Sequence, residues 1–328
     1  MPARFDPIDH VLALDLGARG IASFFTPGAA AAAAAALRGA RRVLVATGFT
    51  VAADTPETDG PPGAAALGRA LRLTGAQVRY VTDAHNVPIL EAALKTHDEP
   101  VDVLVYPDGD GHGPAWLARE RPTHLVAIER PGRAPSGEYL NLRGVPITAW
   151  NRRIDELFLF TSGGALRGSS PTPPIGSNRS GLRRQSRRSV AAAKPALERR
   201  SGRRRRPVTV GVGDGGNEIG MGNVRARLVR QRSPLAPIAS TVRVDHLVVA
   251  GTSNWGAYGV AAALARLTGR DLLHHPDTEV RVIEACVAAG AFDGVTRKRL
   301  ATVDGLAVDV HAAVVELLRA AAAAPPRR

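Results

Sequence analysis

Residues 211 to 222 read Gly-Val-Gly-Asp-Gly-Gly-Asn-Glu-Ile-Gly-Met-Gly, which places six glycines within twelve positions. Asp214 and Glu218 offer two carboxyl groups for proton exchange, and Asn217 offers a hydrogen-bonding amide between them. Glycines let backbone N–H groups approach a bound anion, and those expected to do so here are Gly213, Gly215 and Gly216. We therefore expect Asp214, Glu218 and Asn217 to be catalytic. The alternative is a glycine-rich turn whose acids are merely solvated.

Three more segments carry polar side chains next to predicted elements. Asp59 lies in Glu-Thr-Asp-Gly-Pro-Pro-Gly, just before a predicted helix, where it binds substrate or supports the turn. Arg130 and Arg133 follow a predicted strand, and a guanidinium group can bind a carboxylate through two hydrogen bonds. Surface ion pairs would place arginines in the sequence in the same way. Ser253 and Asn254 start a helix, as N-cap residues or as part of a carboxylate site. The expected substrate-binding side chains are Asp59, Glu129, Arg130, Arg133, Ser253 and Asn254.

No cofactor is required by the sequence. Gly211, Gly213 and Gly216 fit the spacing Gly-x-Gly-x-x-Gly, but Asp214 would place a negative charge in the turn that holds a pyrophosphate, which argues against NAD. The histidines lack the spacing of zinc ligands. One alternative stays open, a Mg²⁺ or Mn²⁺ ion held by Asp214, Glu218 and another carboxylate.

The elements that would position these residues alternate between strand and helix. Strands are predicted at 43–46, 77–82, 101–106, 124–128, 208–212 and 246–250, and helices at 63–74, 88–96, 114–120 and 258–268. This alternation predicts an α/β fold, a mostly parallel sheet flanked by helices in Rossmann-like layers. Ligands bind beyond the carboxyl ends of such strands, so we expect Asp59, Glu129, Asp214, Asn217, Glu218, Ser253 and Asn254 to meet in one cleft.

Residues 159–207 interrupt this alternation. They hold twelve Arg and one Lys against a single Glu, so the rest of the chain is nearly neutral although the formal net charge is +13. Without a period that buries a face, the segment is predicted to be disordered. It is either a true insertion or a stretch translated in a shifted reading frame. The domain is then a single α/β unit formed by 1–158 and 208–328.

The composition also limits location and partners. Cys286 is the only cysteine and lies in an apolar helical pattern, which predicts core packing rather than disulfide bonding. The first residues lack the pattern of a signal peptide, and the alanine runs are too short and too weakly apolar to cross a bilayer. We expect a cytoplasmic protein that acts on a small molecule without contacting a membrane. The sequence does not fix its oligomeric state.

Several of these motifs together resemble the C-terminal domain of the D-glutamate cyclase family. The resemblance covers 9–158 and 208–320. It rests on the glycine run, on Glu57 to Gly63, and on the motifs Ala-Ile-Glu-Arg at 127–130, Ser-Asn-Trp-Gly at 253–256, Gly-Ala-Phe-Asp-Gly-Val-Thr at 290–296 and Val-Asp-Gly at 303–305. It implies a hydro-lyase that cyclises D-glutamate to 5-oxo-D-proline.

The implied reaction requires a base for the α-amine, an acid for the departing hydroxyl and donors for the oxyanion. Asp214 or Glu218 would exchange the protons, the 213–217 backbone and Asn217 would serve the oxyanion, and Arg130 or Arg133 would hold the α-carboxylate. Two other functions stay open. In the first, the domain is a non-catalytic module that binds an amino acid or another carboxylate. In the second, which we rank last, the Arg-rich segment binds nucleic acid.

Overall fold

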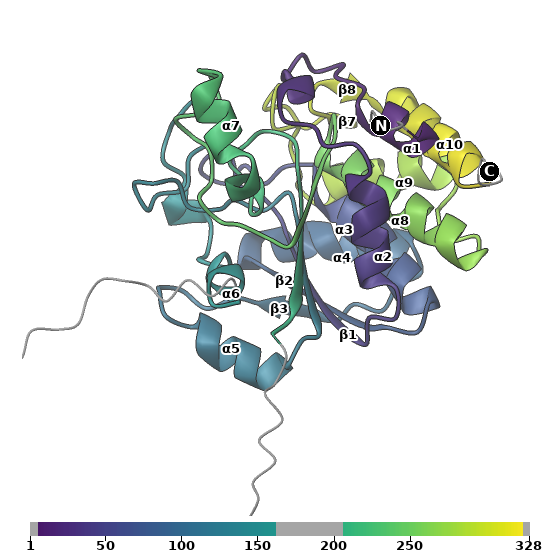
Figure 1. The fold of residues 1–328 in the computed structure, drawn as a ribbon, viewed down its shortest axis with the longest axis horizontal. Coiled ribbons are helices and arrows are strands. Elements are labelled where there is room, and N and C mark those ends of the chain that lie inside the picture. The colour runs from purple at the N-terminus through teal and green to yellow at the C-terminus, as the bar shows by residue number, and fades with distance from the viewer. Residues whose placement is uncertain (1–5, 162–205, 324–328) are drawn as a thin grey trace, which may run out of the picture.

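The computed structural model describes residues 6–161 and 206–323. Its centre is a sheet of six parallel strands in the order β3-β2-β1-β4-β5-β6 (Figure 1). The strands are β1 (Arg42–Thr47), β2 (Gln77–Thr82), β3 (Val103–Val105), β4 (His124–Ile128), β5 (Val208–Gly213) and β6 (His246–Val249). All six predicted strands are present within two residues of their expected ends, so the predicted α/β fold with its parallel sheet is confirmed.

Both faces of the sheet are covered, which explains why its strands are apolar throughout. Along β1, Val43 and Val45 pack into the larger core on one face, whereas Leu44 and Ala46 pack into a second core on the other face. This is the two-residue period of an extended strand. A parallel sheet needs such cover because its crossover connections place helices on both sides.

The larger core is built against helices α1 (Pro7–Leu12), α2 (Ala29–Leu37), α3 (Pro61–Leu73), α4 (Val87–Thr96), α8 (Ser253–Thr268), α9 (Pro276–Ala288) and α10 (Val308–Ala323). On the opposite face lie α5 (Gly113–Glu120) and α6 (Glu156–Leu159). In the view of Figure 1, α7 (Arg225–Arg230) is drawn above these two helices. Cys286 of α9 is fully buried in the larger core, as expected.

The strand order reverses between β1 and β4. The chain runs outward from β1 through β2 to β3, then returns to β4 at the other side of β1 and continues to β6. The loops after β1 and β4 therefore diverge at the sheet's carboxyl edge, where ligands bind in folds of this kind. A small hairpin, β7 (Thr302–Val303) and β8 (Leu306–Ala307), also reaches this edge through the turn at Asp304 and Gly305, whose φ angles are +56° and +80°.

Two expected boundaries are corrected by the structure. The N-cap of α8 is Thr252, whose hydroxyl accepts a hydrogen bond from the Trp255 N–H at 3.2 Å, so Ser253 and Asn254 lie inside the first turn. The prediction of disorder over 159–207 is wrong at both ends of that range, because Leu159 ends α6 and Arg206 binds the Asp245 carboxylate. The remainder of that prediction, at 162–205, lies outside the described residues. No helix in the described ranges is long and apolar enough to cross a membrane.

Candidate active site

The glycine run folds back across the end of β5. A Cβ at Gly211 would lie 2.5 Å from the Ile219 carbonyl oxygen, and one at Gly213 would lie 2.9 Å from the Glu218 carboxyl carbon. The fold-back lets the Glu218 carboxylate accept hydrogen bonds from the N–H groups of Asp214 at 2.8 Å and Gly215 at 2.5 Å. These N–H groups were expected to bind an external anion, but in the structure their anion is the chain's own Glu218.

This fold-back separates the three residues that we expected to be catalytic. Asp214 and Asn217 line a pocket at the sheet's carboxyl edge, whereas Glu218 is fully buried behind it. Asn217 donates its amide Nδ2 to the Leu140 carbonyl oxygen at 2.7 Å. Gly216 adopts a φ of +92°, which favours glycine at that position of the turn. Asp214 is thus the member of the trio whose carboxylate faces the pocket.

Three carboxyl groups meet at the N-terminus of α8. Asp59 accepts hydrogen bonds from the N–H groups of Ser253 at 2.9 Å and Asn254 at 2.8 Å, and Asp214 accepts from the Ser253 N–H at 3.2 Å. The Ser253 hydroxyl donates to Glu129 Oε2 at 2.5 Å. The loops after β4, β5 and β6 therefore converge, as the sequence predicts. The start of α8 binds the chain's own carboxylates, where partial positive charge stabilises them.

Within the described ranges, one largely buried guanidinium, that of Arg19, lies among these acids. Arg19, from the segment between α1 and α2, pairs with Asp214 and lies 2.5 Å from Asp304 of the β7–β8 turn. Burial disfavours the charged form of Arg19, yet the neighbouring acids, Asp214 and Asp304 foremost, raise its pKa well above the usual value. Arg19 therefore stays charged and fixes two acids that come from distant parts of the chain.

Burial also disfavours the charged form of the acids, and it raises their pKa values. Burial raises the pKa of Asp59 to about 7, with Asp304 adding to the effect, although backbone N–H groups of Asn254 and Ser253 oppose it. Burial, Glu218 and Glu57 raise the pKa of Glu129 well above its usual range. The pKa of Asp214 is also well raised by burial, in spite of Arg19. Such shifts cluster at functional sites because low dielectric and like charges are concentrated there.

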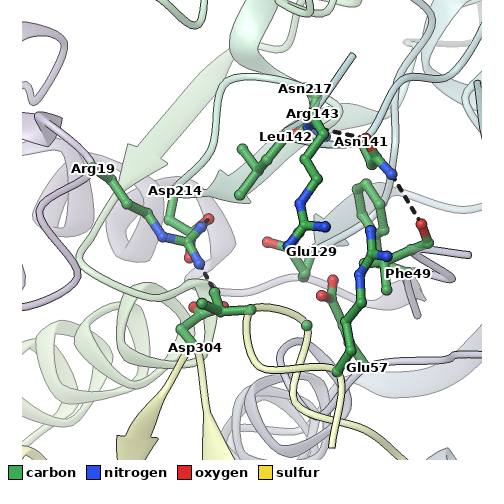
Figure 2. Close-up of a pocket in the computed structure, with 14 residues that line it drawn as sticks. Arg19, Phe49, Glu57, Glu129, Asn141, Leu142, Arg143, Asp214, Asn217 and Asp304 are labelled. Atoms are coloured by element: carbon green, nitrogen blue, oxygen red, sulfur yellow. Dashed lines mark hydrogen bonds and ion pairs between the residues drawn. The ribbon is translucent and has the colours of Figure 1, made fainter. Parts of the chain in front are cut away.

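Glu57 differs from the other acids because its carboxylate accepts no hydrogen bond from any described residue. The residue is only 5% exposed, and burial together with Asp304 and Asp59 raises its pKa well above the usual value. Its carboxylate and that of Glu129 turn toward the same space (Figure 2). Glu57 is thus a buried carboxyl group that remains available to a ligand.

The pocket above this cluster is open to solvent, with which much of its roughly 460 Å³ of free space is continuous (Figure 2). Its charged lining consists of Glu57, Glu129, Asp214 and Asp304 with Arg19, Arg143 and Arg297. Arg143 extends from its loop toward Glu129 (Figure 2), and in the described residues neither Arg143 nor Arg297 has a side-chain ion pair. One pocket thus presents acids in its interior and two uncommitted cations at its exposed rim.

Three of the expected substrate-binding residues have other partners. Arg130 is fully buried, pairs with Asp83 and donates to the carbonyl oxygens of Gly48 and Arg152. Arg133 forms a two-point pair with Asp155 at 2.7 and 2.8 Å. The Asn254 side chain accepts hydrogen bonds from the N–H groups of Gly60 at 3.0 Å and Gly63 at 2.8 Å, which secures the start of α3. None of these three lines the pocket. The other expected substrate-binding residues that are absent from its lining are Asp59, Ser253, Gly213, Gly215 and Gly216.

Sequence reasoning assigned no role to Arg19, Glu57, Asp304, Arg143 or Arg297. Glu57 and Asp304 lie in motifs that carry the family resemblance, and Asp304-Gly305 is a typical two-residue hairpin turn, which was a usable signal. For Arg19, the nearby sequence indicates only a turn, in which the Asp15 carboxylate accepts hydrogen bonds from the N–H groups of Arg19 and Gly20. Nothing in that short turn indicates which distant acids Arg19 will meet.

The site could also accommodate a metal ion. Asp59, Glu129 and Asp214 each offer one carboxylate oxygen, and these oxygens all lie within 4.8 Å of one another. Oxygen donors are those that Mg²⁺ and Ca²⁺ prefer. Glu218, which was expected as a ligand, is not part of this group, and its Oε1 accepts hydrogen bonds from the backbone of its own turn.

Most of the chain matches known proteins in sequence. A family model described as D-glutamate cyclase-like, C-terminal, matches residues 8–166 and 190–319. The human protein named D-glutamate cyclase, mitochondrial, is 32% identical over 276 residues. That alignment covers 78% of this chain but 38% of the human protein, so the chain spans less than half the length of this relative.

Proposed function

The chain belongs to the D-glutamate cyclase-like, C-terminal family, and from that premise we propose that it cyclises D-glutamate to 5-oxo-D-proline with loss of water. The proposal is supported above all by the charge pattern of the pocket. Arg143 and Arg297 at the rim suit the α-carboxylate, and the interior acids suit the ammonium group. The γ-carboxyl of D-glutamate then lies beside Glu57, whose raised pKa lets it donate a hydrogen bond to that group.

The proposed reaction needs no net exchange of protons with the solvent. The ammonium nitrogen loses two protons as it becomes the lactam N–H, and the departing γ-oxygen takes up two protons as it becomes water. A carboxyl group that relays protons from nitrogen to oxygen therefore needs no outside acid or base. Glu57 is the best placed relay because it lines the pocket, is nearly buried and has no hydrogen-bond partner among the described residues.

The other expected catalytic residues then have different parts. Asp214, held in place by Arg19 and the Ser253 N–H, faces the substrate ammonium. Glu218 maintains the turn that presents Asp214. We place the α-carboxylate at Arg143 and Arg297 instead of Arg130 and Arg133, because the latter two are held by Asp83 and Asp155.

The test uses the purified full chain with D-glutamate or L-glutamate and chiral chromatography of the product. We expect 5-oxo-D-proline from D-glutamate, much less product from L-glutamate, and loss of turnover in Glu57→Gln. Saturable binding of D-glutamate without product would replace the cyclase by a carboxylate-binding module. We keep the binding module as the second candidate because the alignment covers only 38% of the human protein.

A further inference from the structure

A second pocket lies away from the candidate active site. It is lined by residues of α3, of the end of α4, of the loop that follows α8 and of the start of α9. Arg69, which lines it, is about 12 Å along the axis of α3 from Pro61, the first residue of that helix. The two pockets share no lining residue, so any ligand of the second pocket is a separate one.

Two buried imidazole rings belong to the lining of this second pocket. His97 and His274 are 4% and 5% exposed, and their ring centroids lie 4.9 Å apart. His97 Nε2 and His274 Nδ1 are buried atoms without a hydrogen-bond partner among the described residues. Buried polar atoms in folded proteins nearly always have a partner. Two such atoms beside one pocket therefore call for a partner from outside the chain.

The other ring nitrogen of His274 already has a partner. His274 Nε2 lies 2.8 Å from Glu279 Oε2, and the Tyr258 hydroxyl donates to Glu279 Oε1 at 3.0 Å. Because a carboxylate accepts, Nε2 carries the proton of this hydrogen bond. Nδ1 is then the ring atom left for a ligand, and it is a donor whenever the ring carries a second proton.

The positive charges around the imidazoles favour an anion. Arg69 and Arg281 line the pocket, and neither forms an ion pair with an acid in the described residues. Burial, the His274 ring and these two arginines hold the pKa of His97 well below its usual value. A bound cation would add to the repulsion, whereas an anion would relieve it. Moreover, the set of three acids or histidines in the described residues that could hold a metal ion includes neither imidazole.

The start of α9 adds partial positive charge to the same pocket. Its N-cap residue, His275, makes no side-chain capping hydrogen bond. Two acids, Asp98 and Asp271, also line the pocket, but both are exposed, and Asp271 pairs with Arg319 at 3.2 Å. Water screens these exposed carboxylates more than it screens charges beside the buried rings. The pocket therefore remains suited to an anion.

We propose that this second pocket binds a phosphate group, either free or carried by a small monoester, between Arg69, Arg281 and the start of α9. Guanidinium groups match the geometry of phosphate oxygens, and helix N-termini bind phosphate through their N–H groups. The Thr278 hydroxyl accepts a hydrogen bond from Arg281 Nη2 at 2.9 Å, so its own proton is available to the phosphate. Phosphate binding here is independent of the proposed cyclisation.

Titration of the full chain with inorganic phosphate, followed by nuclear magnetic resonance of the histidine ring signals, tests the site directly. We expect saturable shifts of the His97 and His274 signals and none for His246 of β6, which does not line the pocket. His97→Phe keeps a flat ring and assigns one signal. A parallel titration with glycerol 3-phosphate identifies the source: tighter binding indicates a phosphate monoester, and weaker binding indicates the free ion.

Arg69→Gln and Arg281→Gln should each raise Kd for phosphate by about 10-fold or more, because each removes a charged hydrogen-bond donor. The matched control is Arg270→Gln, which removes an exposed arginine that is next to Asp271 in the chain but does not line the pocket. It should bind phosphate like the parent chain. Circular dichroism identifies any variant that fails to fold, and the two lining arginines provide independent chances of a folded one.

Three outcomes overturn the phosphate site. They are the absence of saturable shifts in the parent chain, an unchanged Kd in folded Arg69→Gln and Arg281→Gln, and shifts of the His97 and His274 signals by Zn²⁺ but not by phosphate. An unchanged Kd would place the anion on other arginines, such as Arg143 and Arg297 of the first pocket. Phosphate binding without turnover of D-glutamate would retain this site and refute the cyclase, and turnover without phosphate binding would do the reverse.

Discussion

Arg19 Nη2 lies 2.5 Å from Asp304 Oδ1, and the same guanidinium pairs with Asp214. The contact joins the segment that precedes β1, the turn after β5 and the hairpin that precedes α10. Because Arg19 is the buried cation of an acidic cluster, it couples the assembly of the pocket to the closure of the fold. Substitutions at Arg19 should therefore affect both stability and activity.

Arg19→Gln should lower the free energy of unfolding by about 3–5 kcal/mol, the usual cost of removing one partner from a buried ion pair. Arg19→Lys should recover part of this loss, because an ammonium group keeps the charge but cannot bridge two acids in a planar fork. Urea denaturation measures both. Arg41→Gln, at an exposed position before β1, is the matched control and should change stability little. Equal stability of Arg19→Gln and Arg41→Gln would contradict the assigned role.

Glu57 and Glu218 should respond in opposite ways to the same Glu→Gln change. Glu57→Gln removes the relay and should lower kcat by about 10²–10⁴-fold, the usual contribution of a general acid–base group. It also removes a buried carboxyl group that has no hydrogen-bond partner among the described residues, so the Tm of Glu57→Gln should stay the same or rise. Glu218→Gln weakens two hydrogen bonds from N–H groups to a carboxylate and should cost about 1–3 kcal/mol of stability. If Glu57→Gln keeps its turnover and Glu218→Gln alone loses it, the proton relay lies at Glu218.

The strands and their shared carboxyl edge could be predicted because each depends on local patterns. Runs such as 124–128 are apolar on both faces, and each is followed at once by polar or glycine residues. The sequence also indicated Glu129, Asp214 and Ser253, which lie at strand or helix ends and do meet. It did not indicate which acid would face the ligand, because only the folded loop shows that the Glu218 carboxylate turns onto the N–H groups of Asp214 and Gly215, whereas Glu57 receives no hydrogen bond from the described residues.

The arginines illustrate the same limit. Arg130 and Arg133 follow a strand at the expected edge, yet Asp83 and Asp155 take up their guanidinium groups. These partners lie in other loops, and their pairing follows from the packed fold rather than from spacing along the chain. Arg143 and Arg297 form no ion pair with an acid in the described residues.

The pair of Asp245 and Arg206 should make stability depend on acid pH. Hydrogen bonds from Arg206, followed by those from Thr209, lower the pKa of Asp245 from its usual 3.8 to about 2, against the effect of partial burial. A depressed folded-state pKa gives stability that is present above the unfolded pKa and is lost as pH falls through the folded one. The contribution should thus be full above about pH 5 and decline between about pH 4 and pH 2.

Asp245→Asn is the variant that tests this dependence. Its Tm should lie below that of the parent at pH 7, and the difference should shrink as pH is lowered below about 4. Arg206→Gln should give the same pH profile, because it removes the main cause of the shift. A Tm difference that stays constant from pH 7 to pH 3 would show that Asp245 titrates normally in the folded chain.

Arg143 and Arg297 should determine the preference for a substrate with an α-carboxylate. Arg143→Gln and Arg297→Gln should each raise KM for D-glutamate by about 10- to 100-fold with less effect on kcat, since charged hydrogen bonds contribute about 1.5–3 kcal/mol. A probe without the α-carboxylate, 4-aminobutanoate, has the same amine and terminal carboxyl group and would close to 2-pyrrolidinone. Its KM should be high in the parent chain and nearly unchanged in both variants.

The ratio of kcat/KM for the two substrates therefore isolates the guanidinium contacts from general damage to the pocket, which would lower both values together. Arg41→Gln should leave this ratio unchanged. If the Arg143 and Arg297 variants lower kcat/KM equally for both substrates, the α-carboxylate binds elsewhere, and Arg19 is then the remaining cation of the pocket to test.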